Sequence, residues 1–352
     1  MNCDEKYKLI TSIPDEFLQE DQLKNLLSKK PNENIVCYDG FEPSGRMHIA
    51  QGLIRTINTN KLTSCGFKFK FWVADWFAKL NHKLGGDMKK IQNAGKLMIE
   101  TWKACGMNMD NVEFLWTSEE INKQPDKYWS LVMDISSKFS INRILRCTQI
   151  MGRKDEEDLS ASQMFYPVMQ CADIFFLGVD ICSLGLDQRK VNMLALEYCD
   201  KIKRKNKPVI ISHPMLMGLD GSDKMSKSNP MSAIFMDDNE MEVRTKIKKA
   251  YCTPGDIKTN PIIEYYKQIV FQLEKSITIK RKLEDKSFEE IKLDSFDAFI
   301  ESFLSNILHP ADLKLDLTDR INKYLTPIRE HFKSNPEAQK LLKQVKSYKI
   351  TK

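Results

Sequence analysis

The sequence predicts an α/β fold: a doubly wound, Rossmann-like parallel sheet followed by a mostly helical C-terminal domain. Strand-like apolar runs alternate with helical stretches over the first two-thirds of the chain, which is typical of a parallel sheet covered by helices. Beyond residue 232 this alternation gives way to lysine-rich helical segments. The length of 352 residues exceeds one average domain, and 42% hydrophobic residues suffice for a large core.

The first domain is predicted to span residues 1–232. Short apolar runs read as its strands, at 34–41, 67–75, 112–118, 182–187 and 207–216. Apolar residues at three- and four-residue spacing predict helices over 47–65, 87–105 and 187–205. Because ligands of such sheets bind beyond the carboxyl ends of the strands, we expect the functional residues there.

The second domain is predicted to span residues 233–352. Its segments have helical spacing, with breaks at Pro254, Pro261, Pro310 and Pro336. Basic residues cluster at 201–207, 275–282 and 340–352, and the formal net charge is +6. Such clusters are often solvated faces, but they also suit an acidic partner such as nucleic acid.

Composition excludes several classes of protein. No apolar run approaches the roughly 18 residues of a membrane span, and the first residues lack a signal core, so a cytoplasmic protein is expected. The nine cysteines include no Cys-x-x-Cys pair and the five histidines are isolated. This pattern argues against a zinc site and against a disulfide framework.

The stretch YDGFEPSGRMHIAQGL, residues 38–53, predicts a strand, a glycine-containing loop and the start of a helix. Gly40 and Gly45 allow a ligand to approach the backbone closely, and the N–H groups of a helix start attract an anion. His48 falls in the first turn of that helix, where it can donate to a phosphate. Taken alone, the stretch favours an ordinary strand–loop–helix connection with a surface histidine.

The stretch DKMSKSNP, residues 223–230, holds Lys224, Met225 and Lys227 in a short loop of turn-forming residues. An isolated loop of this kind is usually a solvated turn. Together with residues 48–51 (His-Ile-Ala-Gln), however, it resembles the two signature motifs of class I aminoacyl-tRNA synthetases. The second motif, Lys-Met-Ser-Lys-Ser, is complete, whereas only the first half of the His-Ile-Gly-His motif is intact, which leaves the role of Gln51 open.

Between the two motifs, Tyr166, Gln170 and Asp173 follow the i, i+4, i+7 spacing of one helix face. Without the flanking motifs this would be a polar helix edge. With them, it resembles the amino-acid pocket of tyrosyl-tRNA synthetases of the compact archaeal and eukaryotic type. The resemblance implies that Tyr166 and Gln170 hold the amino group of the substrate, and that Asp173 accepts its phenolic hydroxyl.

The same resemblance implies the remaining site residues. Further contacts to tyrosine are expected from Tyr38, Ala74 and Gln188. Contacts to ATP are expected from Gly40, His48, Gln51, Gly185, Asp187, Leu216, Lys224, Met225 and Lys227, of which His48, Lys224 and Lys227 are the catalytic residues. Mg²⁺ should accompany ATP, and no dedicated protein site for a metal is apparent.

The resemblance extends into the second domain, where residues 308–332 are similar to the anticodon-binding domain of these synthetases. It implies that Asp312 reads the first anticodon base, although a helix N-cap after Pro310 explains this carboxylate about as well. It also implies a homodimer, with the interface in residues 127–152.

The expected function is therefore that of a tyrosyl-tRNA synthetase, with L-tyrosine, ATP and tRNA(Tyr) as partners. The nearest alternative is a tryptophanyl-tRNA synthetase, against which Asp173 weighs. A synthetase-like RNA-binding protein without catalysis would need neither the signature lysines nor a complete pocket. A nucleotidyltransferase with no role in tRNA charging would lack the basic helical domain.

Overall fold

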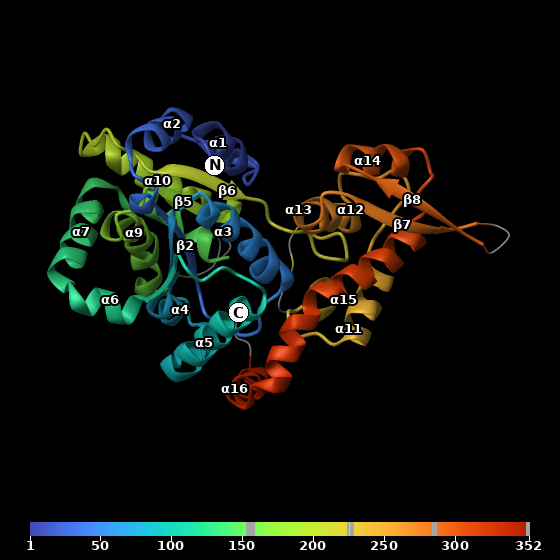
Figure 1. Ribbon diagram of the computed structural model, residues 1–352. Coiled ribbons are helices and arrows are strands. Elements are labelled where there is room, and N and C mark those ends of the chain that lie inside the picture. The colour runs from blue at the N-terminus through green and yellow to red at the C-terminus, as the bar shows by residue number, and fades with distance from the viewer. Residues whose placement is uncertain (153–158, 224, 226–228, 284–286, 350–352) are drawn as a thin grey trace.

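The computed structural model describes residues 1–152, 159–223, 225, 229–283 and 287–349. It combines a six-stranded sheet flanked by helices with a second group of helices and a small hairpin nearer the C-terminus (Figure 1). Within the described residues, no helix is both long and apolar enough to cross a membrane.

The central sheet has the strand order β1-β6-β5-β2-β3-β4, and every pair of neighbours is parallel except β1 with β6. Its strands are β1 (Glu16–Leu18), β2 (Val36–Phe41), β3 (Lys68–Val73), β4 (Val112–Trp116), β5 (Ile181–Gly185) and β6 (Val209–His213). The chain moves outward through β3 and β4 in one direction and through β5 and β6 in the other. The strand order therefore reverses between β2 and β5, which is where doubly wound sheets open a crevice for a ligand.

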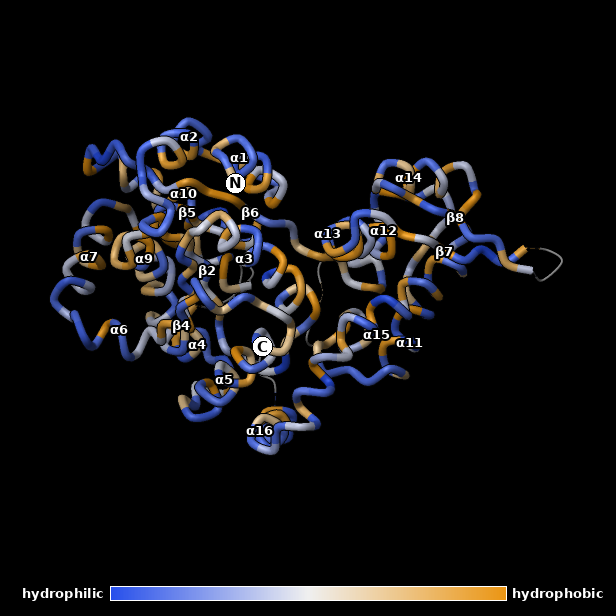
Figure 2. The backbone as a smooth tube through the Cα atoms, viewed as in Figure 1, coloured by the Kyte–Doolittle hydropathy of each residue, from blue (hydrophilic) through white to orange (hydrophobic). Residues whose placement is uncertain are grey.

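The predicted α/β class is confirmed, and the five predicted strands each overlap an observed strand. Strands β5 and β6 are buried at every residue, as expected for strands covered by helices on both faces. Figure 2 shows apolar residues concentrated along these central elements. The surrounding helices are α1 (Cys3–Thr11), α2 (Glu20–Lys29), α3 (Arg55–Ser64), α4 (Asp75–Leu80), α5 (Met88–Ala104), α6 (Thr117–Lys123), α7 (Pro125–Lys138), α8 (Ile141–Leu145), α9 (Ala161–Phe176) and α10 (Arg189–Lys201).

The C-terminal elements are mostly helical, as predicted, but they include an antiparallel hairpin of β7 (Ile277–Lys282) and β8 (Phe288–Leu293). In β7 the buried Ile277 and Ile279 alternate with exposed residues, which is the period of a strand with one buried face. The helices are α11 (Glu240–Lys249), α12 (Pro261–Tyr265), α13 (Phe271–Leu273), α14 (Phe296–Leu304), α15 (Pro310–Ser334) and α16 (Pro336–Lys346).

The end of the chain packs back onto the sheet-containing part. Helix α15 runs obliquely toward α5, and α16 lies beside α5 (Figure 1). Asn93 of α5 donates to the Tyr348 hydroxyl over 2.9 Å, and His331 Nε2 lies 3.1 Å from Glu100 Oε2. The two groups of elements therefore contact each other at more than the single connection between them.

A cluster of ion pairs holds the loop before His48 against the C-terminal helices. Arg46 lies 3.0 Å from both Asp237 and Asp238, whose side chains are nearly inaccessible to solvent. Lys246 of α11 pairs with Asp238 over 2.5 Å, and Lys346 of α16 pairs with Asp237 over 2.6 Å. We call these five residues the acidic-pair cluster.

Backbone hydrogen bonds join the same two segments. The Ile49 N–H donates to the Ile234 carbonyl over 2.8 Å, and the Met236 N–H donates to the Met47 carbonyl over 2.9 Å. The guanidinium of Arg46 lies 4.2 Å from the centre of the Phe235 ring, which stabilises it by a cation–π contact. The first signature motif is therefore fixed to a segment that follows the second signature motif in the chain.

Glu264 of α12 makes a further connection to the sheet-containing part. Its carboxylate accepts a 2.6 Å hydrogen bond from the Met217 N–H, just beyond β6. Burial raises the pKa of this carboxyl from 4.5 to about 7, against the opposing effect of that hydrogen bond. The folded protein therefore binds this proton more tightly than the unfolded chain does.

We predict that Glu264→Gln stabilises the protein at neutral pH but not at acidic pH. Since the pKa is raised on folding, the wild type loses stability as the pH rises from about 4.5 to about 7, whereas the amide does not. The free energy of unfolding of the variant, relative to wild type, should grow across this window by at most ~3 kcal/mol. Urea denaturation of both proteins from pH 4 to pH 8 measures it, and a difference that does not vary with pH would contradict the prediction.

Candidate active site

A cavity of about 320 Å³ opens at the carboxyl ends of the strands, where the order reverses between β2 and β5. It brings together the described site residues predicted in the first domain: Tyr38, Gly40, His48, Gln51, Ala74, Tyr166, Gln170, Asp173, Gly185, Asp187, Gln188, Leu216 and Met225. Lys224 and Lys227 lie outside the described residues. These side chains come from elements far apart in the sequence, and the topology of the sheet explains why they meet.

Asp173 forms the floor of the cavity. It is fully buried on α9, and its Oδ1 accepts a 2.8 Å hydrogen bond from the hydroxyl of Tyr128. Its Oδ2 has no hydrogen-bond partner among the described residues. Burial raises the pKa of this carboxyl well above its ordinary value, although the Tyr128 hydrogen bond and the nearby indole N–H of Trp72, which approaches the carboxyl without completing a hydrogen bond, oppose the shift. A buried acceptor without a partner costs free energy, so a ligand that donates to it gains affinity.

Aromatic side chains surround the space above Asp173. Tyr38 and Trp72 are almost completely buried, on the neighbouring strands β2 and β3. Tyr166 and Phe77 pack edge to face, with ring centres 4.9 Å apart. This end of the cavity is therefore narrow, apolar and lined by rings, with a single carboxylate at its base.

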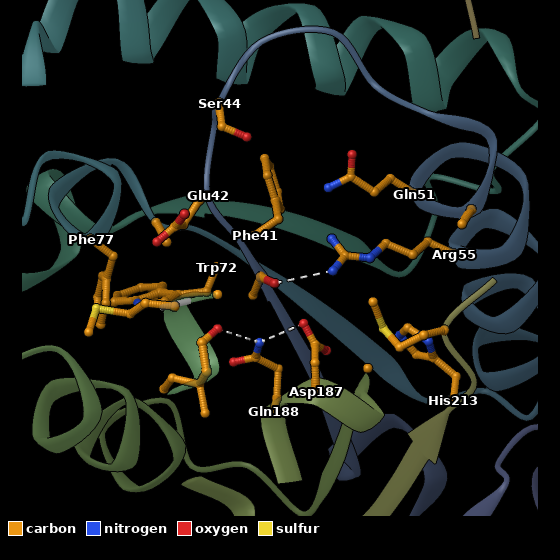
Figure 3. A pocket seen from close by; sticks show the side chains of 18 of the residues that line it. Phe41, Glu42, Ser44, Gln51, Arg55, Trp72, Phe77, Asp187, Gln188 and His213 are labelled. Atoms are coloured by element: carbon orange, nitrogen blue, oxygen red, sulfur yellow. Dashed lines mark hydrogen bonds between the residues drawn. The ribbon is translucent and has the colours of Figure 1, made fainter. Parts of the chain in front are cut away.

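A chain of hydrogen-bonded amides runs along the next wall. Gln170 Nε2 donates to Gln188 Oε1 over 3.0 Å. Gln188 Nε2 in turn donates to Asp187 Oδ2 over 3.1 Å and to the Ile150 carbonyl over 3.2 Å (Figure 3). Gln170, predicted to contact the amino acid, is thus connected to Asp187, predicted to contact ATP.

The helix of the first signature motif begins with a five-residue π-helical segment, η2 (Ala50–Ile54), and continues as α3. Segments of this kind are rare and occur frequently at functional sites. The Gln51 N–H lies 3.4 Å from His48 Nδ1, which favours the tautomer that carries its proton on Nε2. Gln51 Oε1 is buried and has no hydrogen-bond partner among the described residues.

The opposite wall is built from the ends of β5 and β6. A Cβ atom on Gly185 would lie 2.5 Å from Asp187 Oδ1, so only glycine leaves this carboxylate in place. His213 is buried, and burial together with the nearby Arg55 lowers its pKa to about 4, so it is neutral at physiological pH. Leu216 and Met225 are joined by a backbone hydrogen bond of 3.3 Å and complete this side.

Several residues of the cavity were not predicted from the sequence. They include Glu42, Arg55, Trp72, Phe77 and His213, which Figure 3 labels around the space. Glu42 lies between Gly40 and His48 in the stretch of residues 38–53. An acidic side chain in this loop was the sequence feature that could have indicated it.

Arg55 is the cationic residue among these additions. Its Nε lies 3.1 Å from Asp39 Oδ2, and its Nη2 is 3.4 Å from the Gly40 carbonyl. Burial raises the pKa of Asp39 to about 7, while the adjacent guanidinium lowers it. The pair lies where β2 ends and the helix of the first motif begins, a place where no sequence pattern marked a charge pair.

Asp312 lies away from the cavity, in the first turn of α15. It is not the N-cap of that helix, because His309 occupies this position and accepts from the Ala311 N–H. Asp312 Oδ1 instead lies 3.4 Å from the Lys282 N–H at the end of β7. The alternative of an N-cap is therefore wrong, whereas contact with an anticodon base remains a prediction.

No group of three or more His, Cys, Asp or Glu side chains that could hold a metal ion occurs among the described residues. The acidic residues of the cavity are instead committed to side-chain partners: Asp173 to Tyr128, Asp187 to Gln188, and Glu42 to Asn81.

Comparison with known proteins gives a consistent result. The family model described as "tRNA synthetases class I (W and Y)" matches residues 29–326. The chain is 56% identical to "Tyrosine--tRNA ligase 1, cytoplasmic" of Arabidopsis thaliana, over 99% of this chain and 90% of that protein. It is 37% identical to the tyrosine–tRNA ligase of Sulfolobus acidocaldarius, over 98% of each chain.

Among solved structures, it is similar to the tyrosyl-tRNA synthetase of Leishmania major in complex with tyrosinol. The identity is 49% and the TM-score 0.91, over 99% of this chain and 61% of that one. Since the family model spans most of the chain and these relatives match nearly all of it, the chain belongs to the class I tRNA synthetases of the tryptophan and tyrosine branch, among the tyrosine–tRNA ligases.

Proposed function

We propose that this chain activates L-tyrosine with ATP in the cavity described above and transfers the tyrosyl group to the 3′ end of tRNA(Tyr). The observation that carries this proposal is the buried Asp173 carboxylate, whose Oδ2 has no partner among the described residues at the base of an aromatic-lined space. A phenolic hydroxyl at this position supplies the missing hydrogen bond. A substrate without that hydroxyl leaves a buried carboxyl oxygen without a partner, and tyrosyl-tRNA synthetases are the standard example of the resulting discrimination against phenylalanine.

The other end of the cavity suits the amino-acid backbone. Glu42 provides a negative charge close to Tyr166, and burial together with this carboxylate raises the pKa of the Tyr166 hydroxyl. Because Gln170 donates its amide N–H₂ to Gln188, its Oε1 is left to accept from a ligand. An α-ammonium group matches these acceptors, and we assign it to Glu42, Tyr166 and Gln170.

The chemistry requires positioning and charge stabilisation rather than a covalent enzyme intermediate. The carboxylate of tyrosine attacks the α-phosphorus of ATP, forming a new P–O bond while the bond to the bridging oxygen of pyrophosphate breaks. His48, with its proton on Nε2, donates to the phosphates, and Lys224 and Lys227 neutralise the charge that builds on the departing pyrophosphate. Mg²⁺ enters with ATP as its counter-ion, coordinated by phosphate oxygens.

We also propose that the chain works in the cytoplasm as a homodimer. The relative from Arabidopsis carries the word "cytoplasmic" in its name. Large apolar side chains are exposed within residues 127–152, the segment predicted as the interface: Trp129, Met133, Ile141 and Leu145. A second copy that covers these side chains removes them from water, and light scattering of the purified chain tests this.

We further propose a catalytic domain at residues 1–232 and an anticodon-binding domain at residues 233–352.

The most direct test of the proposed function is ATP–pyrophosphate exchange measured with each of the twenty amino acids. Exchange with tyrosine alone is expected. Exchange with tryptophan alone would assign the chain to the other specificity of this branch, and exchange with none would indicate a protein that binds without catalysing.

We predict that Asp173→Asn weakens tyrosine binding by about 10- to 100-fold, the range for a hydrogen bond to a charged group. Tyr128 donates to Oδ1, so the amide oxygen of the variant takes that place and the N–H₂ group replaces the acceptor that faces the phenol. The preference for tyrosine over phenylalanine should narrow, while ATP affinity stays unchanged. Calorimetric titration measures all three, and normal tyrosine affinity would show that the phenol lies elsewhere.

We predict that Lys224→Ala and Lys227→Ala each lower kcat for adenylate formation by ~10²–10³, the scale of removing one donor that stabilises charge in the transition state. Tyrosine affinity should change little, because these lysines act on the phosphates. Stopped-flow rates measured beside equilibrium tyrosine binding separate the two effects. Lys249→Ala, at the exposed end of α11, serves as the control for loss of a positive charge.

We predict that Asp312→Ala raises KM for tRNA and leaves adenylate formation unchanged. A contact of a side chain with a base edge is worth about 1–3 kcal/mol, and the only bond lost within the described residues is the long one to Lys282. Asp319→Ala, exposed on the same helix, removes an equal charge and should leave KM within about twofold. Equal KM values for both variants would argue against a role of Asp312 in recognition.

A further inference from the structure

Arg55 occupies a position on the cavity wall that the two signature motifs do not account for. It follows the π-helical segment η2, and the helix turns His48, Gln51 and Arg55 toward the same space. In Figure 3 its guanidinium extends from α3 into the cavity, with Gln51 on one side and His213 on the other. His48 and Gln51, which line this space with Arg55, are residues that we assign to ATP.

The guanidinium of Arg55 is fixed by contacts to residues of β2. Asp39 pairs with Nε over 3.1 Å, and the Gly40 carbonyl lies 3.4 Å from Nη2. The side chain of Asp39 is 3% exposed and that of Arg55 is 13% exposed, so both charges are largely withdrawn from water. Such a pair is expensive to bury, and apolar residues of similar volume are often as stable in its place. Stability of the fold alone therefore gives little reason to keep it.

These contacts leave one face of the guanidinium uncommitted. Nη1 is buried and has no hydrogen-bond partner among the described residues, and the same is true of Gln51 Oε1 and His213 Nε2 nearby. Nη1 is a donor, whereas Gln51 Oε1 is an acceptor, and His213 Nε2 is one too, since the neutral imidazole donates from Nδ1 to the Pro214 carbonyl. Buried polar atoms without partners are rare in folded proteins, and a ligand that offers both donors and acceptors accounts for all three. The three atoms belong to residues that line one cavity, so a single ligand can reach them.

The sequence indicates why a cation is needed at this place. The first signature motif has Gln51 where the family pattern has a second histidine, so one donor that can carry a charge is missing. Arg55 follows Gln51 by one helical turn, and its charge is fixed at any physiological pH. Its anchoring by Asp39 orients the planar group before any ligand arrives.

We propose that Arg55 is a nucleotide-binding residue of this enzyme, which donates from Nη1 to an acceptor oxygen of the ATP moiety and supplies the donor that the first signature motif lacks. Asp39 is its positioning residue. This inference rests on the proposed function, because it takes ATP as the ligand of this half of the cavity. The acceptor belongs either to a phosphate or to the sugar, and both are hydrogen-bond acceptors of the same nucleotide.

The alternative is that Arg55 and Asp39 form a purely structural pair. The two assignments differ in what the removal of both charges does. If the pair is only structural, replacing both residues leaves no unpaired charge and does not change ligand binding. If Arg55 binds the nucleotide, the same replacement lowers the affinity for the nucleotide. Three variants separate them: Arg55→Lys, Arg55→Met, and the double variant Asp39→Asn with Arg55→Met, which guards against unfolding caused by an unpaired aspartate.

Calorimetry on the full-length chain provides the readout, with AMP, adenosine and tyrosine as probes and thermal unfolding measured beside it. Arg55→Met and the double variant should weaken AMP binding by about 10-fold or more, as for a charge-assisted hydrogen bond, and leave tyrosine binding within about twofold. Arg55→Lys should recover only part of the affinity, because a lysine lacks the planar fork that Asp39 and Gly40 orient. Loss for AMP but not for adenosine assigns the acceptor to the phosphate, and equal loss for both assigns it to the sugar.

Wild-type affinity for AMP in the folded double variant would overturn the inference and leave a structural pair. Equal losses of AMP and tyrosine affinity would overturn it as well, because they indicate a general disturbance of the cavity. Tyrosine-dependent ATP–pyrophosphate exchange by the wild type is measured in parallel. If the wild type fails to exchange, the proposed function fails, whereas normal exchange with unaltered AMP binding by the variants removes only the role of Arg55.

Discussion

The acidic-pair cluster is the interaction on which the arrangement of the molecule depends. Asp237 and Asp238 are nearly inaccessible to solvent, so their charges are tolerable only while cations stay beside them. Those cations come from three separate places: Arg46 from the loop of the first signature motif, Lys246 from α11 and Lys346 from α16. Arg46 is the one cation that pairs with both aspartates, whereas Lys246 and Lys346 each pair with one, so the loss of Arg46 removes a partner from both buried carboxylates at once.

This cluster also links the loop that precedes His48 with the C-terminal helices. Arg46 precedes His48 by two residues, and the backbone bonds from Ile49 and Met47 to residues 234–236 run alongside it. Arg329 of α15 adds a 2.8 Å hydrogen bond to the Asp238 carbonyl. A displacement of α11, α15 or α16 therefore acts on the segment that positions His48, which gives a physical route between the C-terminal helices and the cavity.

The sequence predicted the parallel sheet well because its strands are short apolar runs separated by amphipathic helices, and this pattern is local. It did not predict β1, whose three residues form no apolar run and whose pairing depends on β6, nearly two hundred residues later in the chain. It also missed the hairpin of β7 and β8, because the lysines of β7 obscured the alternation of Ile277 and Ile279. Register and pairing between distant segments are properties of the folded chain.

The residues around the cavity also fall into two groups, those that a local sequence motif identifies and those that only a distant neighbour makes meaningful. Residues within motifs, such as His48 and Asp173, were found because their spacing resembles a known pattern, and the structure brings them together. Trp72, His213 and Tyr128 were missed since each stands in an ordinary apolar strand or helix and gains its meaning only from a neighbour. Arg55 belongs to this second group, because the distant Asp39 is what makes it more than a surface arginine.

The chain of amides from Gln170 through Gln188 to Asp187 has a direction, and that direction has a consequence. The Asp187 carboxylate and the Ile150 carbonyl accept hydrogen bonds and have none to donate. Gln188 must therefore turn its N–H₂ toward them and its oxygen toward Gln170. Gln170 must then turn its N–H₂ toward Gln188, and its oxygen is the end left for a ligand. A carboxylate assigned to one substrate thereby dictates which end of an amide the other substrate meets. The amino-acid side and the nucleotide side of the cavity are therefore joined by hydrogen bonds that run in one direction. Neither glutamine amide can be turned around unless the other turns as well.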